Sequence, residues 1–299
     1  MGSVLTRLPG NDGPWHHVDL SGLLILITGS DSGIGYHAAK DFALRNAHVI
    51  IATRTEQNGT RAVEAIMQAV TARGKKGVAE FMHLDLASLE SVHAFADAFH
   101  ARNLPLHRLI NNAGMFLPED TMTEDGMEVQ LQVNYFAHVY LSHLLLPKLA
   151  AGAPSRIIWV SSPAEASAPP NVDWDNLVPA ESSAPPNVDW DNLEGKGYHS
   201  DLTTYGRSKV YELMTANEMQ KWVQDMAIDV YAVEPGVART GIFSTNKMDM
   251  RKLEAVSMVF VELLVGQPDF LGAISEMFAA SAPESQLPDK GGTTVYGPP

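Results

Sequence analysis

Short β-branched or aliphatic runs alternate with helix-length amphipathic segments along most of the chain, and this alternation limits its possible folds more than any other feature. Each run follows a polar or glycine-containing segment, as strands usually do. The expected strands are LLILIT (23–28), HVIIAT (48–53), AEFMHL (79–84), HRLIN (107–111), RIIWVS (156–161), IDVYAV (228–233) and TTVYG (293–297). Because nearly continuous apolar strands alternate with helices, we predict an α/β domain with a seven-stranded parallel sheet buried on both faces.

The segments between these runs carry apolar residues at three-to-four-residue spacing, which predicts helices that flank the sheet. The expected helices span 34–45, 57–72, 89–102, 125–150, 204–224 and 252–264. This pattern predicts a single doubly wound, Rossmann-type domain over residues 20–299, preceded by an N-terminal extension over 1–19. Such a sheet binds its ligand at the carboxyl ends of its strands.

Composition excludes several classes of function. The formal net charge of −14 argues against nucleic-acid and anionic-lipid partners. The absence of cysteine excludes disulfides and a cysteine nucleophile and suits a reducing compartment. No apolar run is long enough to span a bilayer, so we expect a cytoplasmic protein. The opening MGSVLT fits a myristoylation pattern, which leaves peripheral membrane association open. The histidines show no paired metal-ligand spacing, so no metal is expected.

One segment occurs twice without change. SAPPNVDWDNL stands at 167–177 and again at 183–193, inside a proline-rich stretch over about 163–202 that predicts a long loop. Only the second copy continues into EGKGYHSDLTTYGRSK. We therefore interpret the first copy, roughly 166–181, as a tandem insertion on the surface, with a lid over the substrate cleft as the alternative.

A glycine-rich turn follows the first strand. TGSDSGIG (28–35) leads directly into a helix, and Gly29, Gly33 and Gly35 allow a tight turn and a close approach to a pyrophosphate at the helix N-terminus. This position in a repeating α/β pattern predicts a dinucleotide site. The residues expected to contact the dinucleotide here are Gly29, Ser30, Ser32, Gly33, Ile34 and Gly35.

The ends of the next two strands bear on the choice of cofactor. Arg54, in ATRTE after the second strand, would pair with a 2′-phosphate, so NADP(H) is preferred. NAD(H) stays open, because Arg54 could simply be an exposed arginine. Asp85 and Leu86, after the third strand, are expected beside the adenine, with helix capping as the alternative for Asp85.

Further polar signals recur where strands reach the carboxyl edge of the sheet. Tyr205 and Lys209 in TYGRSK stand four residues apart on one helical face. NNAG (111–114) follows the fourth strand, Asn134 lies in VNYFAH, and Ser162 ends the fifth strand. EPGVART (234–240) follows the sixth strand. The order of these signals predicts one composite site.

These motifs, from LSGLLILITGSDSGIG (20–35) to GGTTVYGPP (291–299), make the chain resemble the short-chain dehydrogenase/reductase family over nearly its whole length. It is most similar to the retinol-dehydrogenase-like and WW-domain-oxidoreductase-like branch, through EDGMEVQLQVNYFAHVYLSHLLLPKL (124–149), WDNLEGKGYHSDLTTYGRSK (190–209) and the ending.

The resemblance implies a role for each matched residue. Tyr205 would be the general acid/base, Lys209 its activator and a ribose ligand, Ser162 the hydroxyl that orients the substrate, and Asn134 the anchor of a water-linked proton relay. Asn112, Ala113 and Gly114 would line the adenosine side of the cofactor. Pro235, Gly236, Val237 and Thr240 would hold the nicotinamide amide and the pyrophosphate.

The implied activity is hydride transfer between NADP(H) and an apolar alcohol, aldehyde or ketone, under a substrate lid at about 240–265. Ser161 and Ser162 are adjacent, so only one of them can face the site, and Pro163 follows where relatives usually have a small or aliphatic residue. An NADP(H)-binding scaffold or sensor with little turnover is therefore the alternative. A homodimer through helices 125–150 and 204–224 is left open.

Overall fold

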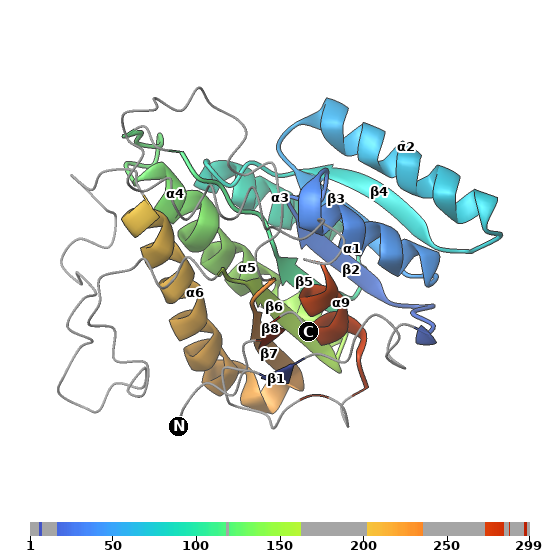
Figure 1. Cartoon of the computed structure of the whole chain (residues 1–299). Helices are drawn as coiled ribbons and strands as arrows, with labels where there is room; N and C mark the ends of the chain where they lie inside the picture. The colour runs from blue at the N-terminus through green and yellow to red at the C-terminus, as the bar shows by residue number, and fades with distance from the viewer. Residues whose placement is uncertain are drawn as a thin grey trace.

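The computed structural model describes residues 17–117, 120–162, 202–235, 273–283 and 287, together with two strand fragments, β1 (Thr6–Arg7) and β8 (Tyr296–Gly297). Six strands form the central sheet, all parallel, in the order β4-β3-β2-β5-β6-β7 (Figure 1). They are β2 (Leu24–Thr28), β3 (His48–Thr53), β4 (Val78–His83), β5 (Arg108–Asn111), β6 (Ser155–Val160) and β7 (Ile228–Val233). This confirms the predicted doubly wound, Rossmann-type sheet.

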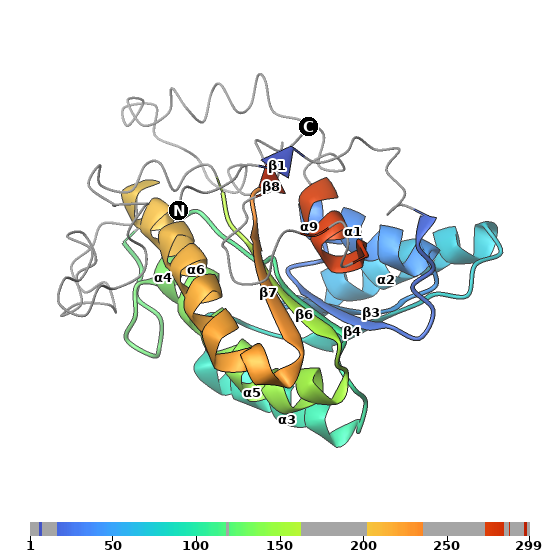
Figure 2. The same cartoon turned by 90° about the horizontal axis from the view of Figure 1, so that it is seen from below.

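Helices cover both faces of this sheet, as Figure 2 shows from below. The helices are α1 (Gly33–Leu44), α2 (Glu56–Ala72), α3 (Leu89–Ala101), α4 (Val129–Leu131), α5 (Ala137–Ala151), α6 (Leu202–Val223) and α9 (Ile274–Ser281). One buried apolar cluster joins the sheet to α1, α2 and α9, and a second joins it to α3, α5 and α6. Every residue of β2, β5, β6 and β7 is buried, which is why these strands read as unbroken apolar runs.

The strand order places the functional edge. The first long strand, β2, pairs with β3 on one side and with β5 on the other, so the chain reverses its direction of travel across the sheet at β2. Parallel sheets of this kind bind ligands in the crevice beyond the carboxyl ends of the two strands at such a switch point. The turns that follow Thr28 and Asn111 meet at this crevice.

The strand count differs from the prediction of seven. Within the described residues the main sheet has six strands, and Tyr296–Gly297, the end of the expected strand 293–297, pairs in parallel with Thr6–Arg7 in a separate two-stranded sheet. An extended apolar run indicates a strand but does not identify its partner, because partners are chosen by tertiary contacts.

The expected helix 125–150 begins later and is not uniform. Gly126 adopts a left-handed conformation with φ of 79°, and Glu128 caps the helix by accepting a hydrogen bond from the Leu131 amide at 2.8 Å. A π-helical turn, η2 (Gln132–Phe136), then separates α4 from α5. π-Turns are rare and often occur at functional sites, and this one contains Asn134.

Helix α9 was not predicted from the sequence. It is short and, at its described side chains, buried all round, so it lacks the apolar stripe that marks an amphipathic helix. Arg108 and Arg156 fix its C-terminal end, because their guanidinium groups donate to the Ala280 and Ala279 carbonyls at 2.6 and 2.9 Å. Cations are favoured at this end of a helix.

In the described part of the chain, no helix combines the length and the apolar character needed to cross a membrane. The expected helix 252–264, the loop over 163–202 and most of the expected lid at 240–265 lie outside the described residues.

Candidate active site

The glycine-rich turn packs directly against the turn after β5. Gly29 has φ of 62°, and a side chain there would approach the Cα and Cβ atoms of Ala113 to 2.9 Å. A side chain at Gly35 would collide with the Asn112 amide. Glycine is therefore required at Gly29 for backbone conformation and close approach, and at Gly35 for close approach alone. The predicted Gly29, Gly35, Asn112 and Ala113 come together in one layer.

The other residues of the turn have different environments. Ser30 is buried, and its hydroxyl donates to the Ile27 carbonyl at 2.8 Å, so its side chain belongs to the core. Ser32 is exposed at the N-cap of α1, where its side chain makes no capping hydrogen bond. The first turn of α1 contains Gly33 and Ile34 and no acidic residue. Its free amides and helix dipole favour a bound anion such as a pyrophosphate.

Thr28, which the sequence analysis did not single out, connects the two turns. Its hydroxyl oxygen accepts hydrogen bonds from the amides of Asn112 and Ala113 at 3.0 and 2.9 Å. The Asn112 side chain returns a hydrogen bond to the Thr28 carbonyl at 2.7 Å. The same hydroxyl lies 2.8 Å from Nε2 of His138 on α5. The cofactor turn is therefore tied to α5 through one buried side chain.

The bonds of His138 fix its tautomer. Its Nδ1 lies 2.8 Å from the Asn134 carbonyl, which can only accept, so Nδ1 carries the proton. The neutral ring then accepts from Thr28 through Nε2. Burial lowers the pKa of His138 from 6.5 to about 4; the Asn134 carbonyl opposes this shift, and the Lys209 charge adds to it. We conclude that His138 is neutral at pH 7.

Asn134 joins three segments through its side chain. Its Oδ1 accepts from the Met115 amide at 2.8 Å, and its Nδ2 donates to the Met115 carbonyl at 3.1 Å and to the Ser208 hydroxyl at 3.0 Å. Ser208 in turn donates to the Tyr205 carbonyl at 2.7 Å. The predicted Asn134 therefore links the segment after β5 to the helix that carries Tyr205 and Lys209.

Tyr205 and Lys209 share one buried face of α6, and the ammonium of Lys209 lies 5.8 Å from the centre of the Tyr205 ring. The ammonium donates to the Val160 carbonyl at the end of β6 at 2.9 Å and to the Glu212 carboxylate at 2.8 Å. Phe116 meets the Tyr205 ring edge-on with centroids 6.0 Å apart. Glu212 was missed by the sequence analysis, because an acidic residue in a polar-looking helix gives no signal of burial.

Ser161 and Ser162 have different environments. Ser161 is buried, its amide donates to the Val233 carbonyl at 2.8 Å, and its hydroxyl faces the Lys209 carbonyl at 3.4 Å. Ser162 is only half-buried. The Ser161 hydroxyl therefore faces α6, and the role of Ser162 in the site stays a prediction from the sequence.

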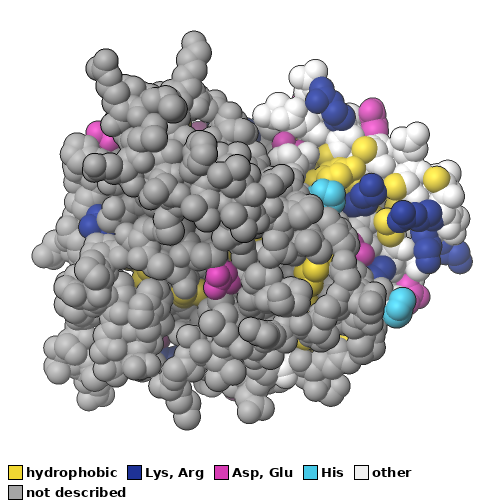
Figure 3. Space-filling model, in the orientation of Figure 1, with side chains coloured by type: hydrophobic (Ala, Val, Ile, Leu, Met, Phe, Trp, Pro, Cys, Tyr) yellow, Lys and Arg dark blue, Asp and Glu magenta, His cyan; other side chains and the backbone are white. Residues whose placement is uncertain are grey.

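At the end of β3, Arg54 is exposed and Thr53 is buried. The Thr53 hydroxyl donates to the Asp31 carboxylate at 2.8 Å, which ties the glycine-rich turn to the strand that carries Arg54. Figure 3 shows several basic side chains on the described surface, on the side of the molecule where α1 and α2 lie. Arg54, the cation expected at this strand end, therefore follows a residue that is hydrogen-bonded to a carboxylate, that of Asp31. Asp31 was not among the residues predicted from the sequence.

Asp85 does not cap α3, which corrects the alternative reading of this residue. Its carboxylate accepts from the Ala87 amide at 2.9 Å, within the turn before the helix. Ser88 is the cap, and its hydroxyl accepts from the Ser91 amide at 3.2 Å. Leu86 is buried in the apolar cluster on the α3 side of the sheet, so its side chain belongs to the core.

At the end of β7, Pro235 is buried and Glu234 is half-buried, and burial raises the pKa of Glu234. The predicted Gly236, Val237 and Thr240 lie outside the described residues. Within the described parts of the chain, no cluster of three or more His, Asp or Glu side chains could hold a metal ion.

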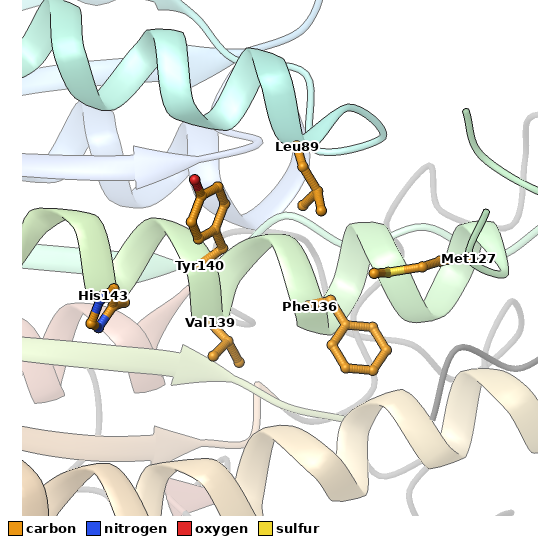
Figure 4. Close-up of a pocket in the computed structure, with 6 residues that line it drawn as sticks. All are labelled: Leu89, Met127, Phe136, Val139, Tyr140 and His143. Carbon is orange, nitrogen blue, oxygen red and sulfur yellow. The ribbon is translucent and has the colours of Figure 1, made fainter. Parts of the chain in front are cut away.

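An apolar hollow of about 390 Å³ opens on the outer side of α5 (Figure 4). Its lining residues are Leu89, Met127, Phe136, Val139, Tyr140 and His143. Asn134 and His138 are buried in the network described above and do not line it. The hollow is therefore separate from the group around Tyr205 and Lys209.

Comparison with known proteins identifies the family. Residues 23–172 match the family model of the short chain dehydrogenases. The chain is 37% identical over 218 residues to the WW domain-containing oxidoreductase of Gallus gallus, covering 73% of this chain but 49% of that protein. It is 33% identical over 246 residues to retinol dehydrogenase 11 of Mus musculus, covering 82% and 71%. The chain thus spans about half the length of the WW domain-containing relatives.

Solved structures agree with this assignment at the level of the fold. A 3-oxoacyl (acyl-carrier-protein) reductase from Agrobacterium tumefaciens, crystallised with NADP bound, superimposes with a TM-score of 0.66 at 18% identity, covering 96% of this chain and 97% of that one. The sheet order, the paired turns at the switch point and these matches lead to one conclusion. The chain belongs to the short-chain dehydrogenase/reductase family, in its retinol-dehydrogenase-like branch.

Proposed function

We propose that this protein is an NADP(H)-dependent oxidoreductase that interconverts an apolar alcohol and its aldehyde or ketone. The observation that carries the proposal is the buried pair on α6: the Lys209 ammonium lies 5.8 Å from the Tyr205 ring centre and is fixed on the carbonyl that ends β6. Tyrosine ordinarily loses its proton near pH 10, so a fixed cation nearby favours the phenolate that acid/base catalysis needs.

The described residues fit a dinucleotide. Gly29 and Gly35 keep side chains out of the turn, and the first turn of α1 offers backbone amides without a competing carboxylate. Gly33, Asn112, Ala113 and Gly114 would line the cradle, with Asp85 and Leu86 beside the adenine. Lys209 would contact the ribose. When bound, the nicotinamide supplies or accepts the hydride.

The chain's own residues would handle the proton. In the reducing direction Tyr205 donates its phenolic proton to the carbonyl oxygen of the substrate, and Ser162 orients that oxygen by a hydrogen bond. Lys209 stabilises the phenolate that remains. Asn134 holds α6 in register with the segment after β5 through Ser208 and Met115, and so keeps Tyr205 in position.

Preference for NADP(H) rests on Arg54, which is exposed at the end of β3 and would pair with a 2′-phosphate. Asp31 opposes this preference, because its carboxylate is held 2.8 Å from Thr53, next to Arg54. Arg54→Ala should weaken NADP⁺ binding about tenfold and leave NAD⁺ binding unchanged, whereas Asp31→Asn should strengthen NADP⁺ binding. Equal affinities for both cofactors in the wild type and in Arg54→Ala, measured by calorimetry, would remove the phosphate-clamp argument.

An apolar substrate is supported by two relatives, the retinol dehydrogenase of Mus musculus and a polyprenol dehydrogenase of Danio rerio that is 32% identical over 282 residues. The substrate lid at about 240–265 and the single domain over 20–299 belong to the same proposal. Cytoplasmic location and homodimer formation stay predictions from the sequence.

The test is NADPH consumption with a panel of apolar aldehydes and ketones. We expect turnover that falls by about a hundredfold or more in Tyr205→Phe, which removes the proton but keeps the ring. Tyr140→Phe, on α5 and lining the separate hollow, is the matched control and should retain activity. Tight cofactor binding without turnover that depends on Tyr205 would instead support the scaffold or sensor alternative.

A further inference from the structure

Lys209 is held by a carboxylate that lies one helical turn further along α6. Its ammonium donates to Glu212 at 2.8 Å and to the Val160 carbonyl at 2.9 Å, and the two side chains are only 3% and 1% exposed. The second ion pair of this spacing on α6, Glu218 with Lys221 at 2.6 Å, lies at the surface, with exposures of 35% and 52%. Both pairs join a lysine to a glutamate, but the Lys209–Glu212 pair is buried and the Glu218–Lys221 pair is at the surface.

We propose that Glu212 is the positioning residue that keeps Lys209 charged and aimed at the end of β6, a role that rests on the proposed function of Lys209. A buried ammonium is costly unless a counter-charge and hydrogen bonds replace its water. A lysine that loses its counter-charge in a dry site tends to give up its proton. A neutral amine would neither stabilise the Tyr205 phenolate nor bind the cofactor as a cation.

Four described titratable side chains lie near the pair, three tyrosines and one histidine. Tyr135, from η2, lies close enough for Glu212 to affect it: burial raises the pKa of Tyr135, the Thr215 hydrogen bond opposes the shift, and the Glu212 charge adds to it. His138, from α5, is the neutral tautomer described above. Tyr205 and Tyr211 flank the pair on α6 itself. Among these titratable neighbours, Glu212 alone is a carboxyl group.

The test is the dissociation constant of NADP⁺, measured by calorimetry between pH 5.5 and 9 and expressed as the ratio of variant to wild type. This ratio cancels titration of the cofactor and of distant groups. In Glu212→Gln the ratio should rise about tenfold across this range as Lys209 loses its proton, and should approach the value for Lys209→Met at high pH. Glu212→Asp should restore part of the affinity. The matched surface variant Glu218→Gln should give a flat ratio near one.

The outcomes separate this inference from the proposed function. If Lys209→Met weakens NADP⁺ binding but the Glu212→Gln ratio stays flat, Glu212 has no such role and the proposed function survives. If Lys209→Met binds NADP⁺ as the wild type does, Lys209 is not in the cofactor site and both proposals fail.

Glu212→Gln could also fail to fold, because removal of one partner from a buried pair is strongly destabilising. The double variant Lys209→Met/Glu212→Gln removes both charges and should then regain the folded circular-dichroism spectrum. A folding defect that the double variant does not repair would overturn the inference, because the defect would not come from an uncompensated Lys209.

Discussion

Replacing Glu276 with Gln should stabilise the protein at neutral and alkaline pH and have almost no effect near pH 4.5. Glu276 lies on α9 and is fully buried, and neither carboxyl oxygen has a hydrogen-bond partner among the described residues. Burial raises the pKa of Glu276 from 4.5 to about 8. The N-terminal position on α9 favours a carboxylate by about 2 kcal/mol at most, which is too little to offset the desolvation.

The magnitude follows from proton linkage. Between pH 4.5 and 8 the folded protein keeps the Glu276 proton and the unfolded chain releases it, so stability falls as pH rises. At about 1.4 kcal/mol per pH unit, the wild type loses about 3 kcal/mol by pH 7 and about 5 kcal/mol by pH 8.5. Glutamine has a similar shape and no proton to lose, so Glu276→Gln should recover these amounts.

The assay is urea unfolding at fixed pH values from 4.5 to 9, followed by circular dichroism. Glu218→Gln is the control, because its carboxyl group lies at the surface and its difference from the wild type should stay small at every pH. A difference between Glu276→Gln and the wild type that does not change with pH would refute the reasoning, since it would mean that Glu276 ionises in the folded protein as it does in the unfolded chain.

Three further predictions concern His138, the α3 cap and the repeated loop. The stability advantage of the wild type over His138→Asn should shrink by about 3 kcal/mol as pH falls from 6.5 to 4, because only the unfolded histidine takes up a proton in this interval. Urea unfolding at each pH measures this difference in stability. A difference that stays constant with pH would contradict a neutral, buried His138 ring. Ser88→Ala should cost about 1 kcal/mol of unfolding free energy, and Asp85→Ala less, if Ser88 is the cap. Deleting 166–181 should leave thermal unfolding and turnover nearly unchanged, whereas loss of substrate affinity alone would identify this segment as a lid.

The sheet could be predicted closely because its strands are buried on both sides. The runs at 48–53 and 228–233 coincide with β3 and β7, and β6 begins one residue before the expected start. A continuous β-branched run has few other stable environments, which is why its bounds are easy to place. The edge strand β4 is less regular, since most of its residues are partly exposed.

The π-turn at Gln132–Phe136 could not be predicted, because the same apolar spacing suits an ordinary helix. The cap at Glu128 was missed because the apolar pattern continues on both sides of it. The residues of the candidate site likewise divide into those that the sequence predicts and those that it does not. Positions set by backbone geometry, such as Gly29 and Gly35, can be recognised from residue type and spacing. Thr28 and His138 could not, since their roles depend on hydrogen bonds between distant segments.

Three buried ionisable groups in this fold meet the cost of desolvation in different ways. His138 stays neutral and satisfies both ring nitrogens, and Glu276 retains its proton. Of these three groups, only Lys209 has a buried charge opposite it, the carboxylate of Glu212. The proposed chemistry requires a permanent cation at that position and nowhere else in the network, because only there does a phenolate, that of Tyr205, have to be stabilised. The buried charge of Lys209 and the proposed reaction therefore lie on the same helix, α6. The pH dependence of variants at His138, Glu276 and Glu212 distinguishes the three ways of meeting the cost of desolvation.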